Sequence, residues 1–354
     1  MRAGPGEAFS TSFASRVEAL REEPAFANYL TVRERVMEMK EREADLADGD
    51  LRPSDYWHEE LEGFEYMLDA SPLVVDKLRH HTYHLTGLRV YEYRSQRDKH
   101  RRALAEKLEA LRELGEDLAV PESPALGGFG FEIDGGLWNV DTLKFLECSL
   151  ALRRGGVLPA LVERPGRLAV WEVGGGWGGY AHHFKTLFPD TTYLITDLPE
   201  VLLFSATYLM TVFPDARVRF HAPGDGAAAF ADLDEVDFVF ASNTALAETR
   251  PARLDLALNM VSFQEMTTAQ VRGYARHARE LGCPWLYSLN RDRSHYNVEI
   301  SSVGQVLRES YWMHEVPMLP VSYPQPLPPK WRKRRPAPAP ERYKHLVGWP
   351  RLHP

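Results

Sequence analysis

The sequence predicts an α/β protein in which a mostly parallel sheet follows a helical amino-terminal module. Residues 9–118 are rich in Glu, Arg, Leu and Ala, with apolar residues at helical spacing. A stretch rich in Gly and Pro interrupts this pattern at 120–136. Beyond residue 164, short β-rich runs alternate with helical segments. Such alternation is typical of parallel strands that are covered by helices on both faces.

The elements of the second part can be assigned in chain order. A helix that stops at two glycines is expected in 140–156. Strands are expected at 167–174, 191–197, 236–243, 254–262 and 285–290, and helices at 180–188, 200–213, 267–281 and 302–310. The β-like runs 311–319 and 343–350 flank a Pro-rich loop at 318–340, and we expect them to pair as an antiparallel hairpin at the sheet edge. We place the boundary of the two parts near residue 125, which gives regions 1–125 and 126–354.

Composition excludes several classes of protein. A net charge of -8 and a pI near 5.9 argue against a nucleic-acid surface, because phosphate binding depends on clustered Lys and Arg. The basic run at 330–335 lies among prolines and is interpreted as a solvated loop. Two cysteines, Cys148 and Cys283, form neither a disulfide framework nor a zinc site. With no signal-peptide pattern and no run of about 18 apolar residues, a cytoplasmic protein without membrane contact is expected.

The run VWEVGGGWGGY, at 170–180, places five glycines after an expected strand. Gly174, Gly176 and Gly179 fit the dinucleotide pattern GxGxxG, in which a helix start meets a pyrophosphate. Gly174, Gly176 and Gly178 follow Glu172 and also fit the pattern of enzymes that use S-adenosylmethionine (SAM). The carboxylate of Glu172 would repel a pyrophosphate but suits a ligand with an ammonium and a sulfonium. A glycine-rich turn without a ligand is the third interpretation.

The next expected strand ends in Asp197, within TDLPEV. A carboxylate about 20 residues after the glycine loop can accept hydrogen bonds from ribose hydroxyls, which NAD and SAM both have. The alternative is that Asp197 caps the helix that begins near Pro199.

EVGGGWGG followed by ITDLPEV resembles small-molecule O-methyltransferases. LDLALNMVSFQEM (254–266), LYSLNR, RYKHLVG and RHHTYHLTG (79–87) are similar to a family of sugar O-methyltransferases that serve glycosylated natural products, and the match covers roughly 79–348. The resemblance implies a Rossmann-like methyltransferase sheet, SAM as cofactor and S-adenosylhomocysteine as product. It also implies these cofactor-binding positions: Glu172, Gly174, Gly175, Gly176, Trp177, Gly178, Asp197, Leu198, Asn243 and Asn259.

Methyl transfer to a hydroxyl needs alignment and a base. Related sugar methyltransferases that work without metal have a histidine base just after the fourth strand, where this chain has Gln264 and Glu265. Glu265 is the first candidate base, and its alternative role is to cap the helix that begins near Met266. His295, after the fifth strand, is the second candidate, and its alternative is a mobile surface histidine.

Substrate contacts are expected from the same strand ends and from the helical module. The candidates are Tyr83, His84, Trp138, Ser262, Gln264, Asn290 and Asp292. Trp138, Tyr83 and Trp177 can stack on a sugar face, although core packing explains most tryptophans. His80 and His84 have a metal-binding spacing but no carboxylate partner in the sequence nearby, and packing or acceptor contacts are the other interpretations. Because metal-dependent sugar methyltransferases carry adjacent aspartates after the fifth strand, where this chain has NRDRSH, we predict no metal.

The functional prediction is a SAM-dependent O-methyltransferase that acts on a sugar or glycosylated natural product in secondary-metabolite biosynthesis. In it, region 1–125 would roof the acceptor site and could mediate a homodimer. One alternative is an NAD(P)-dependent oxidoreductase, although no Tyr-x-x-x-Lys set is found. Another is a non-catalytic subunit with a SAM fold that binds a ligand or a partner.

Overall fold

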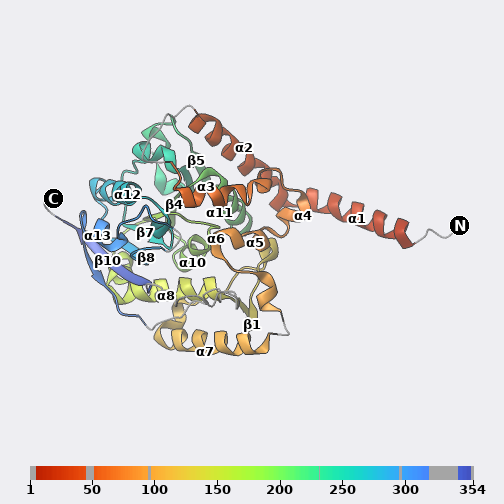
Figure 1. Cartoon of the computed structure of the whole chain (residues 1–354), viewed down its shortest axis with the longest axis horizontal. Helices are drawn as coiled ribbons and strands as arrows, with labels where there is room; N and C mark the ends of the chain where they lie inside the picture. The colour runs from red at the N-terminus through yellow and green to blue at the C-terminus, as the bar shows by residue number, and fades with distance from the viewer. Residues whose placement is uncertain are drawn as a thin grey trace, which may run out of the picture.

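An eight-stranded sheet lies at the centre of the molecule (Figure 1). The computed structural model describes residues 5–44, 52–94, 97–230, 232–294, 297–318 and 342–351. The spatial order of the strands is β5 (Val218–His221), β6 (Phe238–Ser242), β4 (Thr191–Asp197), β3 (Leu168–Val173), β7 (Leu256–Met260), β8 (Leu286–Asn290), β10 (Lys344–Pro350) and β9 (Tyr311–Glu315). The first six strands are parallel, and β10 and β9 run antiparallel at the edge. The predicted α/β fold with an antiparallel edge hairpin is therefore confirmed.

The connections of the sheet reverse direction beside β3. From β3 the chain moves to β4 and then to β6 on one side, and it later returns to β7 and β8 on the other side. This is the 3-2-1-4-5 order of doubly wound nucleotide-binding sheets, with β5 added at one edge. Because the two crossovers leave β3 and β7 in opposite directions, a crevice opens at the carboxyl ends of these strands. Ligands bind at this position in open α/β sheets.

Each face of the sheet packs against its own helices, because successive side chains of a strand point to opposite faces. In β3, Val170 belongs to the core beneath α8 (Val140–Arg154), α10 (Gly179–Leu187) and α11 (Pro199–Val212). Its neighbour Trp171 belongs to the core beneath α12 (Thr268–Glu280) and α13 (Val303–Leu307). All six residues of β3 are buried, as expected for a strand covered on both faces.

The amino-terminal helices pack on the first of these faces. Helix α2 (Pro24–Ala44) buries Tyr29, Val32, Val36 and Met39 and lies along α11, whereas α1 (Pro5–Arg21) extends away from the body (Figure 1). Helix α7 (Asp98–Gly115) lies along α8 through an apolar stripe that includes Leu104, Leu108 and Leu111. Helix α9 spans Val157–Val162. The division at residue 125 stays a prediction.

The segment 78–93, which has helical spacing in the sequence, is broken into short pieces. These are α5 (Leu78–His81), α6 (Tyr83–Thr86) and the 3-10 turn η2 (Val90–Tyr93). Gly87 ends α6 with φ +71°, a left-handed conformation that glycine adopts at little cost. Of the preceding helices, α3 (Asp55–Glu62) has eight residues and α4 (Pro72–Val75) has four.

Two further features connect these parts. A hairpin of β1 (Phe131–Ile133) and β2 (Gly136–Trp138) precedes α8. The other 3-10 turns are η1 (Glu65–Asp69), η3 (Glu116–Leu118), η4 (Ala125–Gly127), η5 (Ala227–Phe230), η6 (Leu233–Glu235), η7 (Asn243–Glu248) and η8 (Phe263–Glu265). The basic run 330–335 and all of the Pro-rich loop except Met318 lie outside the described residues. In the part of the chain that the structure describes, no helix has the length and apolar character needed to cross a membrane.

Candidate active site

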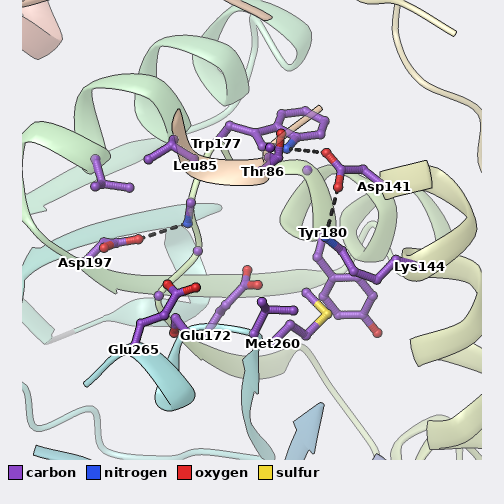
Figure 2. Close-up of a pocket in the computed structure, with 18 of the residues that line it drawn as sticks. Leu85, Thr86, Asp141, Lys144, Glu172, Trp177, Tyr180, Asp197, Met260 and Glu265 are labelled. Carbon is purple, nitrogen blue, oxygen red and sulfur yellow. Dashed lines mark hydrogen bonds and ion pairs between the residues drawn. The ribbon is translucent and has the colours of Figure 1, made fainter. Parts of the chain in front are cut away.

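A cavity of about 710 Å³ opens at the carboxyl ends of β3, β4 and β7. Its floor includes the glycine loop 174–177, Asp197 and Glu265, and Figure 2 shows the side chains of Asp197 and Glu265 on the sheet side. Its roof includes residues 85–89 and Tyr91 from the amino-terminal part, and α8 closes one side. Pockets of about 300–1,000 Å³ are typical of small-molecule sites. The cavity therefore has the size and the place of a ligand site at the reversal point of the sheet.

The glycine loop brings bare backbone to the cavity. Gly174 and Gly176 have φ values of +74° and +55°, where residues with a Cβ are strained. A Cβ on Gly174 would also collide with Ser262 Oγ, and a Cβ on Gly175 would lie 2.7 Å from the Cγ2 of Ile195. The chain needs glycine here both for conformation and for space, which leaves the backbone open to a ligand above it.

Glu172 is the last acidic group before this loop, and it lines the cavity although only 1% of the residue is exposed. Its Oε2 accepts a hydrogen bond of 2.9 Å from the hydroxyl of Tyr193 on the neighbouring strand. Burial raises the pKa of Glu172 to about 8, and the nearby carboxyl of Asp197 adds to this effect. A cation placed in the cavity would restore the ionised form of Glu172.

Asp197 stands at the end of β4 and faces the glycine loop (Figure 2). It accepts hydrogen bonds from the amides of Gly176, at 2.9 Å, and of Leu198, at 2.8 Å. Burial raises its pKa to about 7, although these two hydrogen bonds act in the opposite direction. Leu198, and not Asp197, is the N-cap residue of α11. Asp197 therefore connects the end of β4 to the glycine loop at the cavity wall. It is not the N-cap of α11, so the helix-cap interpretation is wrong.

Glu265 projects into the cavity from η8 (Figure 2). Burial raises its pKa to about 8, and the charges of Glu60 and Asp197 contribute in the same direction. The N-cap of α12 is Thr267, which forms a capping box with Gln270. Because Thr267 already caps the start of α12, Glu265 does not have the N-cap role that was its alternative.

The chain turns sharply just before Glu265. Val261 follows β7 and lines the cavity with φ +68°, a conformation that a β-branched residue rarely adopts. Ser54 Oγ, from the amino-terminal part, donates a hydrogen bond of 2.5 Å to the carbonyl of Glu265. Strained backbone that its surroundings hold in place is frequent at functional sites.

Helix α8 supplies two cavity residues that sequence reasoning missed, Asp141 and Lys144. Lys144 Nζ lies 2.9 Å from Asp141 Oδ1, and Trp177 Nε1 donates to Asp141 Oδ2 at 3.2 Å. Burial lowers the pKa of Lys144, but the Asp141 carboxylate outweighs this effect, so the net shift is upward. In the sequence, Asp141 and Lys144 are an acidic and a basic residue three positions apart in an expected helix. That pattern alone indicates a helix and not a cavity. The cavity thus has a fixed cation at its α8 end, across from Asp197 in Figure 2.

Trp177, Leu198, Asn243 and Ser262 also line the cavity, as expected for ligand contacts. Gly178 packs beneath α11 instead, since a Cβ there would lie 3.1 Å from Leu209. Further lining residues that were not predicted include Trp57, Leu85, Tyr91, Tyr180, Arg291 and Tyr343.

Three predicted residues lie just below the cavity, in a buried hydrogen-bond network. Asn259 Nδ2 donates to the carbonyl of Val173 at 2.7 Å, and its Oδ1 accepts from Asn290 Nδ2 at 2.8 Å. Gln264 Oε1 accepts from the amide of Arg291 at 3.0 Å. These amides connect β3, β7 and β8, so the structure gives Asn259, Gln264 and Asn290 a scaffolding position rather than a place in the lining.

The other proposed substrate residues are not among those that line the cavity. Asp292 accepts a 3.0 Å hydrogen bond from the amide of Gly304, at the start of α13, and pairs with Lys344. Trp138 is buried in the β1–β2 hairpin, with the guanidinium of Arg112 4.8 Å from its ring centroid. The rings of Tyr83 and His84, both in α6, have centroids 3.8 Å apart and are tilted by 37°, and Tyr83 is exposed.

His295 lies outside the described residues. Within the described ranges, no group of three or more His, Cys, Asp or Glu side chains is arranged to hold a metal ion. Metal-free chemistry stays a prediction.

No protein-family model matches the sequence, and no curated protein sequence matches it. Solved structures with a similar fold include the pyocyanin biosynthetic protein PhzM (14% identity, TM-score 0.33) and the S-adenosylmethionine-dependent methyltransferase SibL (14%, 0.31). The N-methyltransferase NodS from Bradyrhizobium japonicum is a third (11%, 0.35). The alignments cover 57%, 70% and 56% of this chain and 57%, 68% and 94% of those proteins, so this chain spans less than two thirds of PhzM. The similarity is distant, and the function has to be argued from the site itself.

Proposed function

We propose that the cavity binds S-adenosylmethionine and that the protein transfers its methyl group to a hydroxyl. The observation that carries this proposal is the set of three carboxyl groups, Glu172, Asp197 and Glu265, around a bare glycine loop. A dinucleotide would bring a pyrophosphate to the same loop, where its negative charge would oppose the ionisation of carboxyl groups whose pKa burial already raises. A ligand with an ammonium and a sulfonium would instead be attracted.

The charges along the cavity suggest how the cofactor lies. Asp197 is suited to accept hydrogen bonds from the ribose hydroxyls, since it already stands beside the amide of Gly176. Lys144, at the α8 end, is suited to pair with the carboxylate of the methionine part. Glu172 lies under the loop and is suited to the ammonium. Asn243 and Leu198, which follow β6 and β4, are suited to the adenine side of the ribose.

Glu265 is our candidate base. When bound, SAM would supply a methyl group whose carbon an oxygen nucleophile attacks in line, with S-adenosylhomocysteine as the leaving group once the carbon–sulfur bond breaks. A carboxyl group with a pKa of about 8 is a poorer acid than an exposed one, so its ionised form takes a proton more readily near neutral pH. In this proposal Glu265 holds the acceptor hydroxyl and receives its proton as the new bond between oxygen and carbon forms. His295 remains the second candidate.

The acceptor is proposed to be a sugar or a glycosylated natural product. The sequence motifs shared with sugar O-methyltransferases support this class. The roof and walls also offer aromatic faces at Trp57, Tyr91 and Tyr343, and such faces pack well against the apolar side of a sugar ring. A homodimer through the amino-terminal helices, a cytoplasmic location and an absence of nucleic-acid partners stay parts of the proposal.

The two alternative functions make different demands on the site. An NAD(P)-dependent oxidoreductase would require a pyrophosphate next to Glu172 and Asp197, which the charges disfavour. A non-catalytic subunit would have no use for a carboxyl group such as Glu265 in the cavity, with its raised pKa. Both alternatives predict that no methyl group is transferred.

The proposal can be tested by incubating the protein with SAM that carries a deuterated methyl group and with a panel of glycosides and nucleotide sugars. Mass spectrometry should detect a labelled O-methyl product with at least one of them. The same reaction with EDTA should proceed at an unchanged rate, and loss of the product that magnesium restores would overturn the metal-free assignment. Binding of SAM without any product from a broad panel would favour the non-catalytic subunit.

A further inference from the structure

An ion pair between Arg79 and Glu122 is buried behind the cavity wall. Both side chains are fully shielded from solvent. Arg79 Nε donates to Glu122 Oε1 at 2.8 Å, and Arg79 Nη2 donates to Glu122 Oε2 at 3.0 Å. A third nitrogen, Nη1, donates to Thr82 Oγ1. The two partners come from α5 and from the segment before η4, far apart in the chain.

The guanidinium of Arg79 touches two residues of the cavity wall. Its Cζ lies over the indole of Trp177, 3.5 Å from a ring centroid, and its Nη2 is 3.8 Å from Asp141 Oδ2. The same Asp141 oxygen accepts the hydrogen bond from Trp177 Nε1. Arg79 does not line the cavity itself, whereas Trp177 and Asp141 do.

Glu122 fixes the start of α8 in a similar way. It accepts a hydrogen bond from Asn139 Nδ2 and another, of 3.2 Å, from the amide of Phe129. Asn139 is the N-cap of α8 and forms a capping box with Thr142. The first turn of α8 contains Asp141, and Lys144 follows on the same helix. The ion pair therefore reaches both the glycine loop and the helix that carries the cavity cation.

Buried ion pairs seldom add net stability, because removing two charges from water costs about as much as their attraction returns. Apolar side chains of similar volume would fill this position with equal or greater stability. A buried Arg79–Glu122 pair is therefore better explained by the need to hold Trp177 and the start of α8 in place than by a gain in stability.

We propose that the Arg79–Glu122 pair is a positioning unit that sets the indole of Trp177 and the first turn of α8 for cofactor binding. The identity of the cofactor rests on the function proposed above, but the positioning itself does not. Arg79 and Glu122 act only through Trp177, Asp141 and the cap of α8.

The variant Arg79→Lys keeps the buried charge but loses the planar fork that stacks on an indole and bonds Glu122 twice. The matched control is Arg167→Lys. Arg167 pairs with Asp237, with Nη2 2.6 Å from Oδ1, at the amino-terminal end of the sheet and away from the cavity. Both variants lose an arginine that bonds carboxylates through two nitrogens, to Glu122 alone for Arg79 and to Asp237 and Asp190 for Arg167. Only the first should alter the cavity.

The first readout needs no ligand. Hydrogen exchange at the amides of residues 174–179 should be faster in Arg79→Lys than in the wild type and unchanged in Arg167→Lys. If Arg79→Lys does not fold, Glu122→Gln takes its place, because its side-chain carbonyl can still accept from Asn139. Equal protection of the loop in a folded variant of the pair would overturn the proposal.

The second readout is the affinity for S-adenosylhomocysteine, measured by calorimetry. Arg79→Lys should weaken binding about fivefold or more, and this loss should be clearly smaller in a Trp177→Phe background, because residues that act as a unit are not additive. A full additional loss in that background would contradict action through Trp177. If the wild type does not bind this ligand, the proposed function fails, whereas hydrogen exchange still decides the positioning role.

Discussion

The floor and the roof of the cavity are built differently. The floor residues Glu172 and Asp197 stand at the ends of buried strands, each held by hydrogen bonds to its neighbours. The roof consists of short turns, with α6 only four residues long and Tyr91 42% exposed. Regions with few buried contacts open most easily. We infer that the rigid floor fixes the cofactor, and that the roof meets the more variable acceptor.

The largest effect is expected where floor and roof meet, at Glu265. Glu265→Gln keeps the shape of the side chain but removes the proton acceptor, so turnover should fall roughly 100-fold or more. Cofactor affinity should fall far less than turnover, because Glu172 and Asp197 remain and Glu265 is proposed to face the acceptor. Steady-state kinetics with an accepted glycoside, together with calorimetry, measures both quantities. If Glu265→Gln stays active and His295→Ala is inactive, the base lies in the segment that follows β8.

The next effect tests the floor alone. Asp197→Ala should lose about 1.5 to 3 kcal/mol of cofactor binding, the range for hydrogen bonds to a charged group. The control is Asp190→Ala, at the opposite end of the same strand, where the side chain is 73% exposed. Calorimetry with S-adenosylhomocysteine should show the loss only in the first variant. Unchanged affinity in a folded Asp197→Ala protein would remove the ribose assignment.

A smaller effect is expected in the roof. Tyr91→Ala should raise the KM for the acceptor about two- to tenfold, which corresponds to the loss of one aromatic contact. The affinity for the cofactor should not change. A variant that loses cofactor binding instead would mean that the roof and the floor do not divide their roles as we infer.

The smallest effect concerns stability and pH. The pKa of Glu172 is about 8 in the folded protein and about 4.3 in an unfolded chain. Folding therefore takes up a proton between these values, and the protein without ligand loses stability as pH rises from about 5 to about 8. Glu172→Gln removes this loss. Its Tm should exceed that of the wild type by about 2 °C or more at pH 8, and the difference should shrink toward pH 5.

Thermal unfolding at both pH values, without ligand, measures this difference. A Glu172→Gln protein that is less stable than the wild type at pH 8 would show that the ionised carboxylate is well accommodated without a cation.

Much of the fold was predictable because the central strands are short, apolar and separated by breakers. The edge strand β5 was missed, since its four residues include Arg219 and His221 and give no apolar run. The spacing of apolar residues in 78–93 predicts helix, because periodicity does not reveal where Gly87 ends a turn. Such local breaks depend on backbone conformation and not on the spacing of apolar residues.

The same contrast holds for the site. Residues that directly follow strands, such as Glu172, Asp197 and Glu265, could be proposed because strand ends meet at one edge of the sheet. Asp141 and Lys144 could not, since their place depends on how α8 packs on the glycine loop. Arg79 could not be proposed for another reason. Charged residues are usually exposed, so the sequence does not predict a fully buried arginine, which is found only through its partners in the structure.

Calorimetry with SAM, S-adenosylhomocysteine, NAD and NADP tests the central claim most directly. With three carboxyl groups around the glycine loop, the protein should bind the first two ligands, and neither dinucleotide should give a measurable signal at the same concentrations. Tight binding of NAD or NADP, with no binding of SAM, would contradict the account and would make the glycine loop a pyrophosphate site.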